Sequence, residues 1–115
     1  MNIDSLREFC LSLPSVTEDI KWENNLVFSV GGKMFCMASL YPAFKISFKV
    51  SDQEYEDLIT HPGFMPAPYL ARAKWVVLSE QSTLHKQQWQ LYITLSYELI
   101  KAKLTNKLRG ELGID

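Results

Sequence analysis

The sequence predicts an α+β fold, a two-layer sandwich of an antiparallel sheet with helices on one face, in the order α-β-β-β-α-β-α. Three observations predict it. Helical apolar spacing is present near both ends, a Gly-Gly pair separates two strand-like runs, and the run FKISFKV alternates cleanly between apolar and polar residues. The 115 residues are expected to form one domain, 1–115, large enough to bury a core without a metal or a disulfide.

The first element is predicted to be a helix capped by Asp4 and ended by Pro14. Its apolar residues recur at helical spacing: Ile3, Leu6, Phe9, Cys10 and Leu13. Cys10 falls on this apolar stripe, and Cys36 falls inside a strand-like run. We expect them to be small buried residues and not a disulfide.

Three strands are predicted next. Asn25–Val30 and Lys33–Leu40 form a hairpin through Gly31-Gly32, and Tyr41-Pro42 breaks the chain before Phe44–Val50. In this third strand the apolar side chains alternate toward the core, so that Lys45, Ser47 and Lys49 face the other way. The opposite face of this strand is therefore predicted to be polar and cationic.

The second half begins with Ser51 and Glu54, which form a capping box for a short acidic helix through Ile59. A valine-rich strand is predicted at Lys74–Leu78, and the longest helix at residues 83–104. The stretch TNKLRGELGID is predicted to be a short helical tail. The inward positions expected for the long helix are Leu84, Trp89, Tyr92, Ile93, Tyr97, Ile100 and Leu104.

Composition and hydropathy argue against a disordered, a membrane-spanning and a secreted protein. The apolar fraction of 47% and charged fraction of 22% are typical of a folded globular chain. No apolar run approaches the roughly 18 residues of a membrane span, and MNIDSLREF lacks the apolar region of a signal peptide. We therefore expect a cytoplasmic protein with no membrane partner.

No catalytic or metal-binding arrangement is recognisable in the sequence. His61 and His85 lack a partner at metal or triad spacing, Glu18-Asp19 is expected in a loop, and Gly31-Gly32-Lys33 lacks the spacing of a phosphate loop. We expect a protein that is not an enzyme and has no cofactor or metal.

The stretch HPGFMPAPYLARAKWVVL, residues 61–78, carries the strongest binding signal. Its prolines make Met65–Tyr69 a stiff, extended path, and basic side chains next to aromatic ones suit phosphates and bases. The net charge is −1, but residues 1–60 carry −4 and residues 61–115 carry +3. The candidate binding surface comprises Lys45, Lys49, Pro66, Pro68, Tyr69, Arg72, Lys74 and Trp75. The alternative is that Tyr69 and Trp75 are core residues and the basic residues merely solvate a rim.

Four stretches give the chain a family resemblance: LREFCLSLPSVTE, VGGKMF, PGFMPAPYLARAKWV and SYELIKAKL. In this order and at these distances they resemble the MmcQ/YjbR family of small bacterial proteins. The resemblance implies a CyaY-like or secretion-chaperone-like α+β fold and a DNA-binding protein of the "double-wing" type. It brings no catalytic residue and no cofactor.

Three functions follow as hypotheses. The first is a non-enzymatic binding module whose partner is DNA, which the resemblance and the charge of residues 61–115 favour. The second is a protein–protein interaction or adaptor module that uses the open sheet face or an edge strand. The third, an enzyme of unrecognised class, lacks any visible nucleophile–base pair or metal-binding arrangement.

Overall fold

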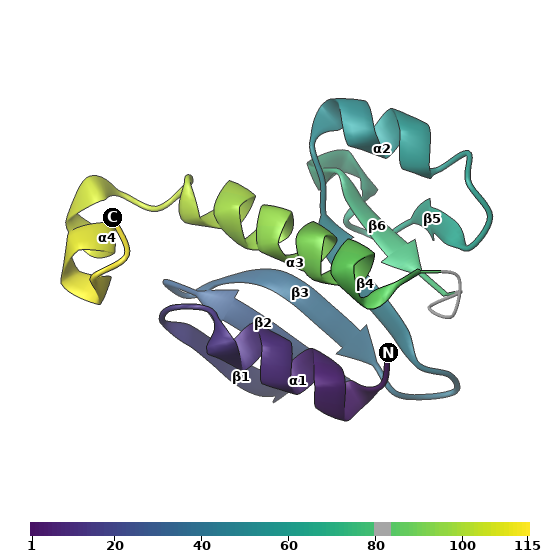
Figure 1. Ribbon diagram of the computed structural model, residues 1–115, viewed down its shortest axis with the longest axis horizontal. Coiled ribbons are helices and arrows are strands. Elements are labelled where there is room, and N and C mark those ends of the chain that lie inside the picture. Colours follow the sequence, from purple (N-terminus) through teal and green to yellow (C-terminus); the bar gives the residue numbers. More distant parts are fainter. Residues whose placement is uncertain (80–83) are drawn as a thin grey trace.

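Six strands form one antiparallel sheet in the order β1-β2-β3-β4-β6-β5, and α1, α2 and α3 share one core on a single face of it (Figure 1). The computed structural model describes residues 1–79 and 84–115. The predicted α+β sandwich is confirmed, with two strands more than expected. The elements are α1 (Ile3–Ser12), β1 (Val16–Lys21), β2 (Asn25–Val30), β3 (Lys33–Ser39), β4 (Lys45–Lys49), α2 (Asp52–Leu58), β5 (Phe64–Pro66), the 3₁₀ turn η1 (Ala71–Ala73), β6 (Trp75–Leu78), α3 (Lys86–Lys101) and α4 (Asn106–Leu112).

The two additional strands, β1 and β5, are the edges of the sheet. β1 pairs with β2 and contains Glu18 and Asp19, so the loop expected for these two residues is wrong. β5 is three residues long and pairs with β6. Edge strands carry charges and prolines that reduce edge-to-edge pairing. For this reason neither segment shows the apolar alternation of a buried strand.

The ends of α1 and α3 differ from the predicted ones. Asn2, and not Asp4, caps α1: its Oδ1 accepts from the Ser5 N–H at 2.8 Å and its own N–H donates to Ser5 Oγ at 3.0 Å. α3 begins at Lys86, where the His85 N–H donates to Gln88 Oε1 at 2.9 Å. The predicted helix start at position 83 lies outside the described residues.

The Gly-Gly hairpin is present as predicted, with φ of 58° at Gly31 and 81° at Gly32. Next to it, the pairing changes register: Phe28 pairs with Cys36, whereas Ser29 pairs with Met34. Phe35 is the extra residue of this β-bulge, and it shifts the alternation of β3 by one position. Because of the bulge, Phe35 and Cys36 both lie in the main core.

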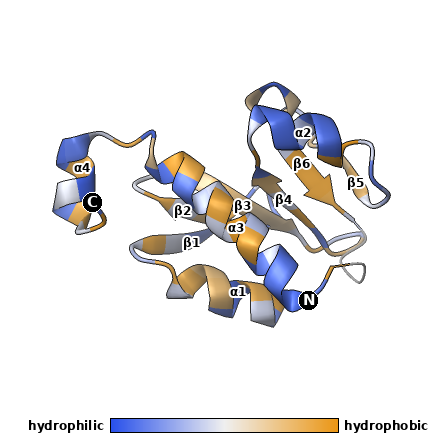
Figure 2. Cartoon of the chain, turned by 45° about the horizontal axis from the view of Figure 1, so that its top comes forward, coloured by the Kyte–Doolittle hydropathy of each residue, from blue (hydrophilic) through white to orange (hydrophobic). Residues whose placement is uncertain are grey.

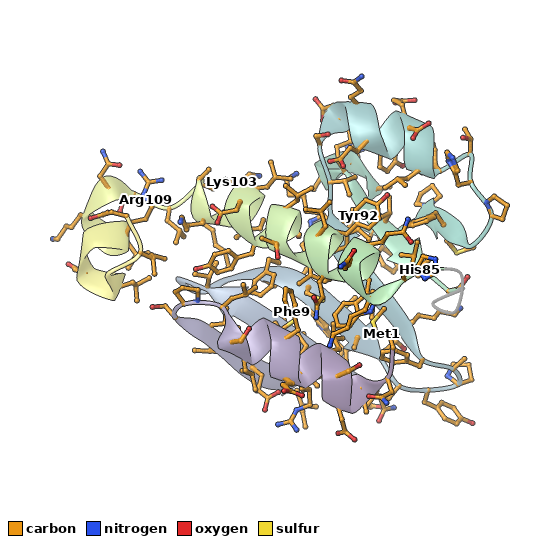
Figure 3. All side chains as sticks on the ribbon, viewed as in Figure 1. Met1, Phe9, His85, Tyr92, Lys103 and Arg109 are labelled. Carbon is orange, nitrogen blue, oxygen red and sulfur yellow. The ribbon has the colours of Figure 1, made fainter. Side chains whose placement is uncertain are left out.

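The main core lies between the sheet and the helices. The Phe9 and Trp89 rings meet edge to face with centroids 5.7 Å apart, which joins α1 to α3. Phe9 lies between these two helices (Figure 3). Tyr92 stacks on Phe48, with centroids 5.5 Å apart. The expected inward positions of α3 are confirmed, and Cys10 and Cys36 are buried free thiols, as predicted. The largest fully buried side chains are Phe28, Phe35, Phe48, Leu6, Ile46, Leu78 and Ile93.

A buried serine attaches α3 to the sheet. Ser96 Oγ donates to the Phe35 carbonyl at 2.6 Å and accepts from the Lys49 N–H at 2.9 Å. Phe35 is the bulge residue, so its carbonyl is bonded by a side chain in place of β2. One hydroxyl thus satisfies a backbone group on each of β3 and β4.

None of the helices in the described part of the chain has the length and apolar character that a bilayer crossing requires.

Candidate functional site

A second, smaller apolar cluster lies on the sheet face that the helices leave open. It consists of Ala67, Trp75 and Val77, with Met34 and Leu70 packed against them. β6 contributes to both clusters and is hydrophobic along its length (Figure 2). On β4 the side chains that face this side are polar, as predicted, but β3 and β6 make much of the open face apolar.

The connection from β5 to β6 folds back onto this cluster. The Ala67 N–H donates to the Trp75 carbonyl at 3.0 Å, and the Trp75 N–H donates to the Leu70 carbonyl at 3.2 Å. Between them the chain reverses, with φ of 66° at Tyr69 and a bond of 3.1 Å from the Leu70 N–H to the Ala67 carbonyl. The extended path predicted for Met65–Tyr69 is therefore wrong at Tyr69, because the chain must turn to bring Leu70 over Trp75.

This fold-back helps to form a groove of about 680 Å³ on the open face. Its floor crosses the adjacent strands β2, β3, β4, β6 and β5, a span of about 19 Å at the usual strand spacing. Apolar and aromatic side chains predominate in it, with a few polar groups. The groove is lined by Trp22, Asn25, Met34, Met37, Ser39, Lys45, Ser47, Met65, Ala67, Pro68, Tyr69, Leu70 and Val77.

Three of the eight predicted site residues line this groove: Lys45, Pro68 and Tyr69. The Tyr69 side chain is fully exposed. Among the described residues, no ion pair involves Lys45, and no carboxylate lines the groove.

Two further predicted residues, Lys49 and Lys74, belong to a cation cluster with Lys103. Burial lowers the pKa of Lys49, and the nearby cations of Lys103 and Lys74 lower it further, while Asp52 opposes them. The Lys49 ammonium donates to the Ala73 carbonyl. Lys74 Nζ lies 4.8 Å from the centre of the Tyr55 ring, and Lys103 follows the end of α3 (Figure 3).

The remaining three predicted residues differ in how far they are buried. Pro66 and Arg72 are exposed. Trp75 is only 3% exposed and belongs to the second apolar cluster. The alternative, in which Trp75 is a core residue, is therefore correct, and the Trp75 ring is not part of a binding surface.

Sequence reasoning did not find four of the groove's main side chains: Trp22, Met34, Met37 and Met65. Trp22 was missed together with β1, because it lies in the turn that joins β1 to β2. The sequence KMFCMAS could have indicated that Met34 and Met37 lie at a binding surface, because it is apolar at both odd and even positions. A strand that is apolar on both faces indicates a covered or binding second face.

Among the described residues, the carboxylate of Glu18 and the ring of His61 have structural contacts. Glu18 accepts from Arg7 at 2.9 and 2.6 Å, and this partner lowers the pKa of the Glu18 carboxyl. Asp19, the next residue of β1, points to the opposite face of the sheet. His61 Nδ1 lies 2.9 Å from the Asp57 carbonyl oxygen. Within residues 1–79 and 84–115, no three His, Cys, Asp or Glu side chains are placed to hold a metal.

Together, these features define a class of protein: a small α+β domain with helices on one sheet face and an apolar groove on the other. The family to which the chain belongs is shown by its sequence. The YjbR family model matches residues 11–99, so the chain belongs to the YjbR family, as the four motif stretches predicted.

Two solved structures resemble the chain. The crystal structure of protein DR2400 of Deinococcus radiodurans, which contains the family domain DUF419, is 28% identical to it with a TM-score of 0.89, covering 99% of this chain and 89% of that one. A structural-genomics target from Pseudomonas syringae is 20% identical with a TM-score of 0.75, covering 87% of this chain and 99% of that one, and shows the fold alone. No curated protein matches the chain.

Proposed function

We propose that this protein is a non-enzymatic binding module that takes part of another protein in the groove of its open sheet face. The observation that carries the proposal is the groove itself, whose apolar and aromatic lining includes three methionines. Methionine side chains are flexible and polarisable, and they recur on surfaces that accept varied apolar partners. The few polar groups among them, Asn25, Ser39, Lys45 and Ser47, would orient a partner.

Exposure supports the same proposal. Trp22, Met65 and Tyr69 are large apolar or aromatic side chains that are exposed and line one groove. Contiguous exposed apolar surface is uncommon on monomers and often marks an interaction site. In this proposal the partner covers these side chains.

Photo-crosslinking in cells tests the proposal. The residue p-benzoylphenylalanine is placed at position 65 in the groove or, as a control, at position 91 on the outer side of α3. Met65 and Leu91 are similarly exposed apolar residues. We expect protein adducts from position 65, their loss on Met37→Glu in the groove floor, and none from position 91. Equal adducts from both positions would contradict the proposal.

DNA is the second candidate partner, and a specific observation favours it. The exposed Tyr69 and Arg72 lie on the same segment as Lys74, which belongs to the Lys49–Lys74–Lys103 cation cluster. Cations neutralise phosphates and an exposed aromatic ring can stack on a base.

Anisotropy of labelled duplex and single-stranded DNA against salt concentration tests this candidate. If DNA is the partner, Arg72→Ala and Lys74→Ala should each reduce the log–log salt slope by about 0.7 to 0.9, which corresponds to one phosphate contact. Lys107→Ala, on the distant α4 (Figure 1), should leave the slope unchanged. Absence of binding even at low salt would exclude DNA.

A further inference from the structure

Two exposed aromatic residues that line the groove have an unusual backbone conformation. Trp22, 64% exposed, has φ of 50°, and the fully exposed Tyr69 has φ of 66°. Trp22 lies in the turn between β1 and β2, whereas Tyr69 lies in the connection between β5 and β6. They therefore come from opposite edges of the sheet, with the groove between them.

The β1–β2 turn, where Glu23 also has a φ of 69°, and the reversal at Tyr69 account for the backbone conformation but do not require an aromatic side chain at either position. A left-handed backbone is unfavourable for bulky residues, which is why glycine and asparagine are the usual residues there. The Tyr69 ring gains no burial in return, because it is fully exposed. Backbone strain of this kind concentrates at ligand-binding sites.

Charge narrows the class of ligand. Among the described groove-lining residues, Lys45 is the charged one at neutral pH, and it makes no ion pair there. A partner that covers the groove removes water from this ammonium group, which is costly unless an opposite charge replaces the water. Ser47 on the same strand adds a hydroxyl group beside it, whereas the hydroxyl of Ser39, which pairs with Lys45, already donates to the Tyr41 carbonyl at 3.2 Å. A carboxylate on the partner satisfies this arrangement.

Size favours a peptide over a small metabolite. The groove floor spans about 19 Å, the length of roughly six residues of extended chain. Small ligands are usually largely enclosed, whereas the Tyr69 ring extends fully into solvent. Only a partner that rises above the groove floor can contact that ring along its length.

We propose that the groove binds an apolar peptide segment of a partner protein that carries one carboxylate, with the carboxylate at Lys45 and the segment held between Trp22 and Tyr69. This inference rests on the proposed function and names the chemistry of the segment. Trp22 and Tyr69 supply rigid aromatic contacts, the residues that contribute most at interfaces. The methionines of the floor adapt to the apolar side chains.

Titration of the full chain with synthetic peptides tests the proposal. The probes are three ten-residue peptides with blocked ends, in which leucine, methionine and phenylalanine alternate with serine and one central residue is Glu, Gln or Lys. Trp22 emission reports binding, because Trp75 and Trp89 are each 3% exposed and Trp22 is not. We expect a blue shift, with the Glu peptide binding about two- to fivefold more tightly than the Gln peptide and the Lys peptide binding most weakly.

Single variants test whether Lys45 sets the preference among the peptides and whether Tyr69 contributes to their affinity. Lys45→Glu should reverse the order of the three peptides. Tyr69→Asn, which keeps a residue tolerant of positive φ, should weaken the Glu peptide by about tenfold. Tyr41→Asn removes another exposed tyrosine that does not line the groove and should change nothing.

Three results would overturn the proposal. The first is equal affinity for all three peptides, and the second is unchanged affinity in Tyr69→Asn. The third is a Trp22 shift with decanoate but with none of the peptides, which would make the groove a site for small apolar anions. Crosslinks from position 65 without peptide binding would overturn this inference and leave the proposed function standing, whereas absence of both would overturn both.

Discussion

At the scale of single residues, the structure separates side chains that stabilise the fold from side chains that are available to a partner. Trp75 and Tyr69 are close in sequence and both were predicted at the binding surface. Trp75 packs against Ala67 and Val77, whereas Tyr69 is fully exposed. Composition could not distinguish them, because the difference depends on the turn at Tyr69, which directs one ring inward and the other out.

The first prediction concerns Tyr69. Tyr69→Asn should leave the free energy of unfolding unchanged or raise it by up to about 1 kcal/mol, because asparagine tolerates a positive φ better and no buried area is lost. Urea denaturation measures this change. A loss of more than about 1 kcal/mol would show that the ring stabilises the fold and would weaken its assignment to binding.

The second prediction concerns Ser96. Ser96→Ala should lower the free energy of unfolding by about 1–3 kcal/mol, since the Phe35 carbonyl and the Lys49 N–H both lose their hydroxyl partner in a buried place. Ser12→Ala, at an exposed serine on α1, should change it by less than about 0.5 kcal/mol. Similar values for the two variants would mean that other groups or water satisfy the backbone at this point.

At the scale of elements, the sequence located the buried strands and missed the edges. β4 shows a regular alternation because Ile46 and Phe48 lie in the core. β1 shows none, because it packs few side chains and is held mainly by pairing with β2. The bulge at Phe35 was also unpredictable, since one extra residue reverses the faces of the residues beyond it without a mark in composition.

The third prediction concerns the β2–β3 hairpin. A Cβ at Gly31 would lie 2.7 Å from Leu104 Cδ1, whereas at Gly32 it meets nothing within 4 Å, and both glycines have positive φ. Gly32→Ala should therefore lower the free energy of unfolding by about 1 kcal/mol through the backbone alone. Gly31→Ala should add a further loss of about 1 kcal/mol or more, because buried Leu104 must move.

Thermal or urea denaturation of the two glycine variants gives this comparison directly. If Gly31→Ala and Gly32→Ala destabilise equally, then Leu104 moves aside without loss and the hairpin does not restrict the segment after α3.

At the scale of the whole molecule, the two faces of the sheet have different roles. One face carries the main core under α1, α2 and α3, and the other carries a small cluster and the groove. The groove residues come from the β1–β2 turn, the five strands β2 to β6, and the β5–β6 connection. No local stretch of sequence contains more than part of it.

The fourth prediction concerns alkaline pH. Burial, and then the Glu98 carboxylate, raise the pKa of Tyr97, whose hydroxyl donates to the Pro14 carbonyl at 2.7 Å. The unfolded chain then loses this proton at lower pH than the folded chain. The stability that Tyr97 contributes is therefore complete below its ordinary pKa of about 10 and is lost as the pH rises above that value.

Comparison with Tyr97→Phe isolates this effect. At pH 8 the variant should be less stable by about 1 kcal/mol, because its hydrogen bond to Pro14 is missing. The gap between the two proteins should narrow as the pH rises above 10, and other groups, including Lys49 with its lowered pKa, cancel in the difference. A gap that stays constant to pH 11 would show that Tyr97 does not titrate differently in the two states.

The sequence by itself determined the fold class, the central hairpin, the core-facing positions of α3 and membership of the YjbR family. These features depend on local periodicity and on residues that are adjacent in the chain. Only the tertiary structure decided that much of the open face is apolar and that Lys45, Pro68 and Tyr69 line one groove with Trp22 and the methionines. The reason is physical: the groove is assembled by strand register, a bulge and a reversal at Tyr69, which bring together residues that are far apart in sequence.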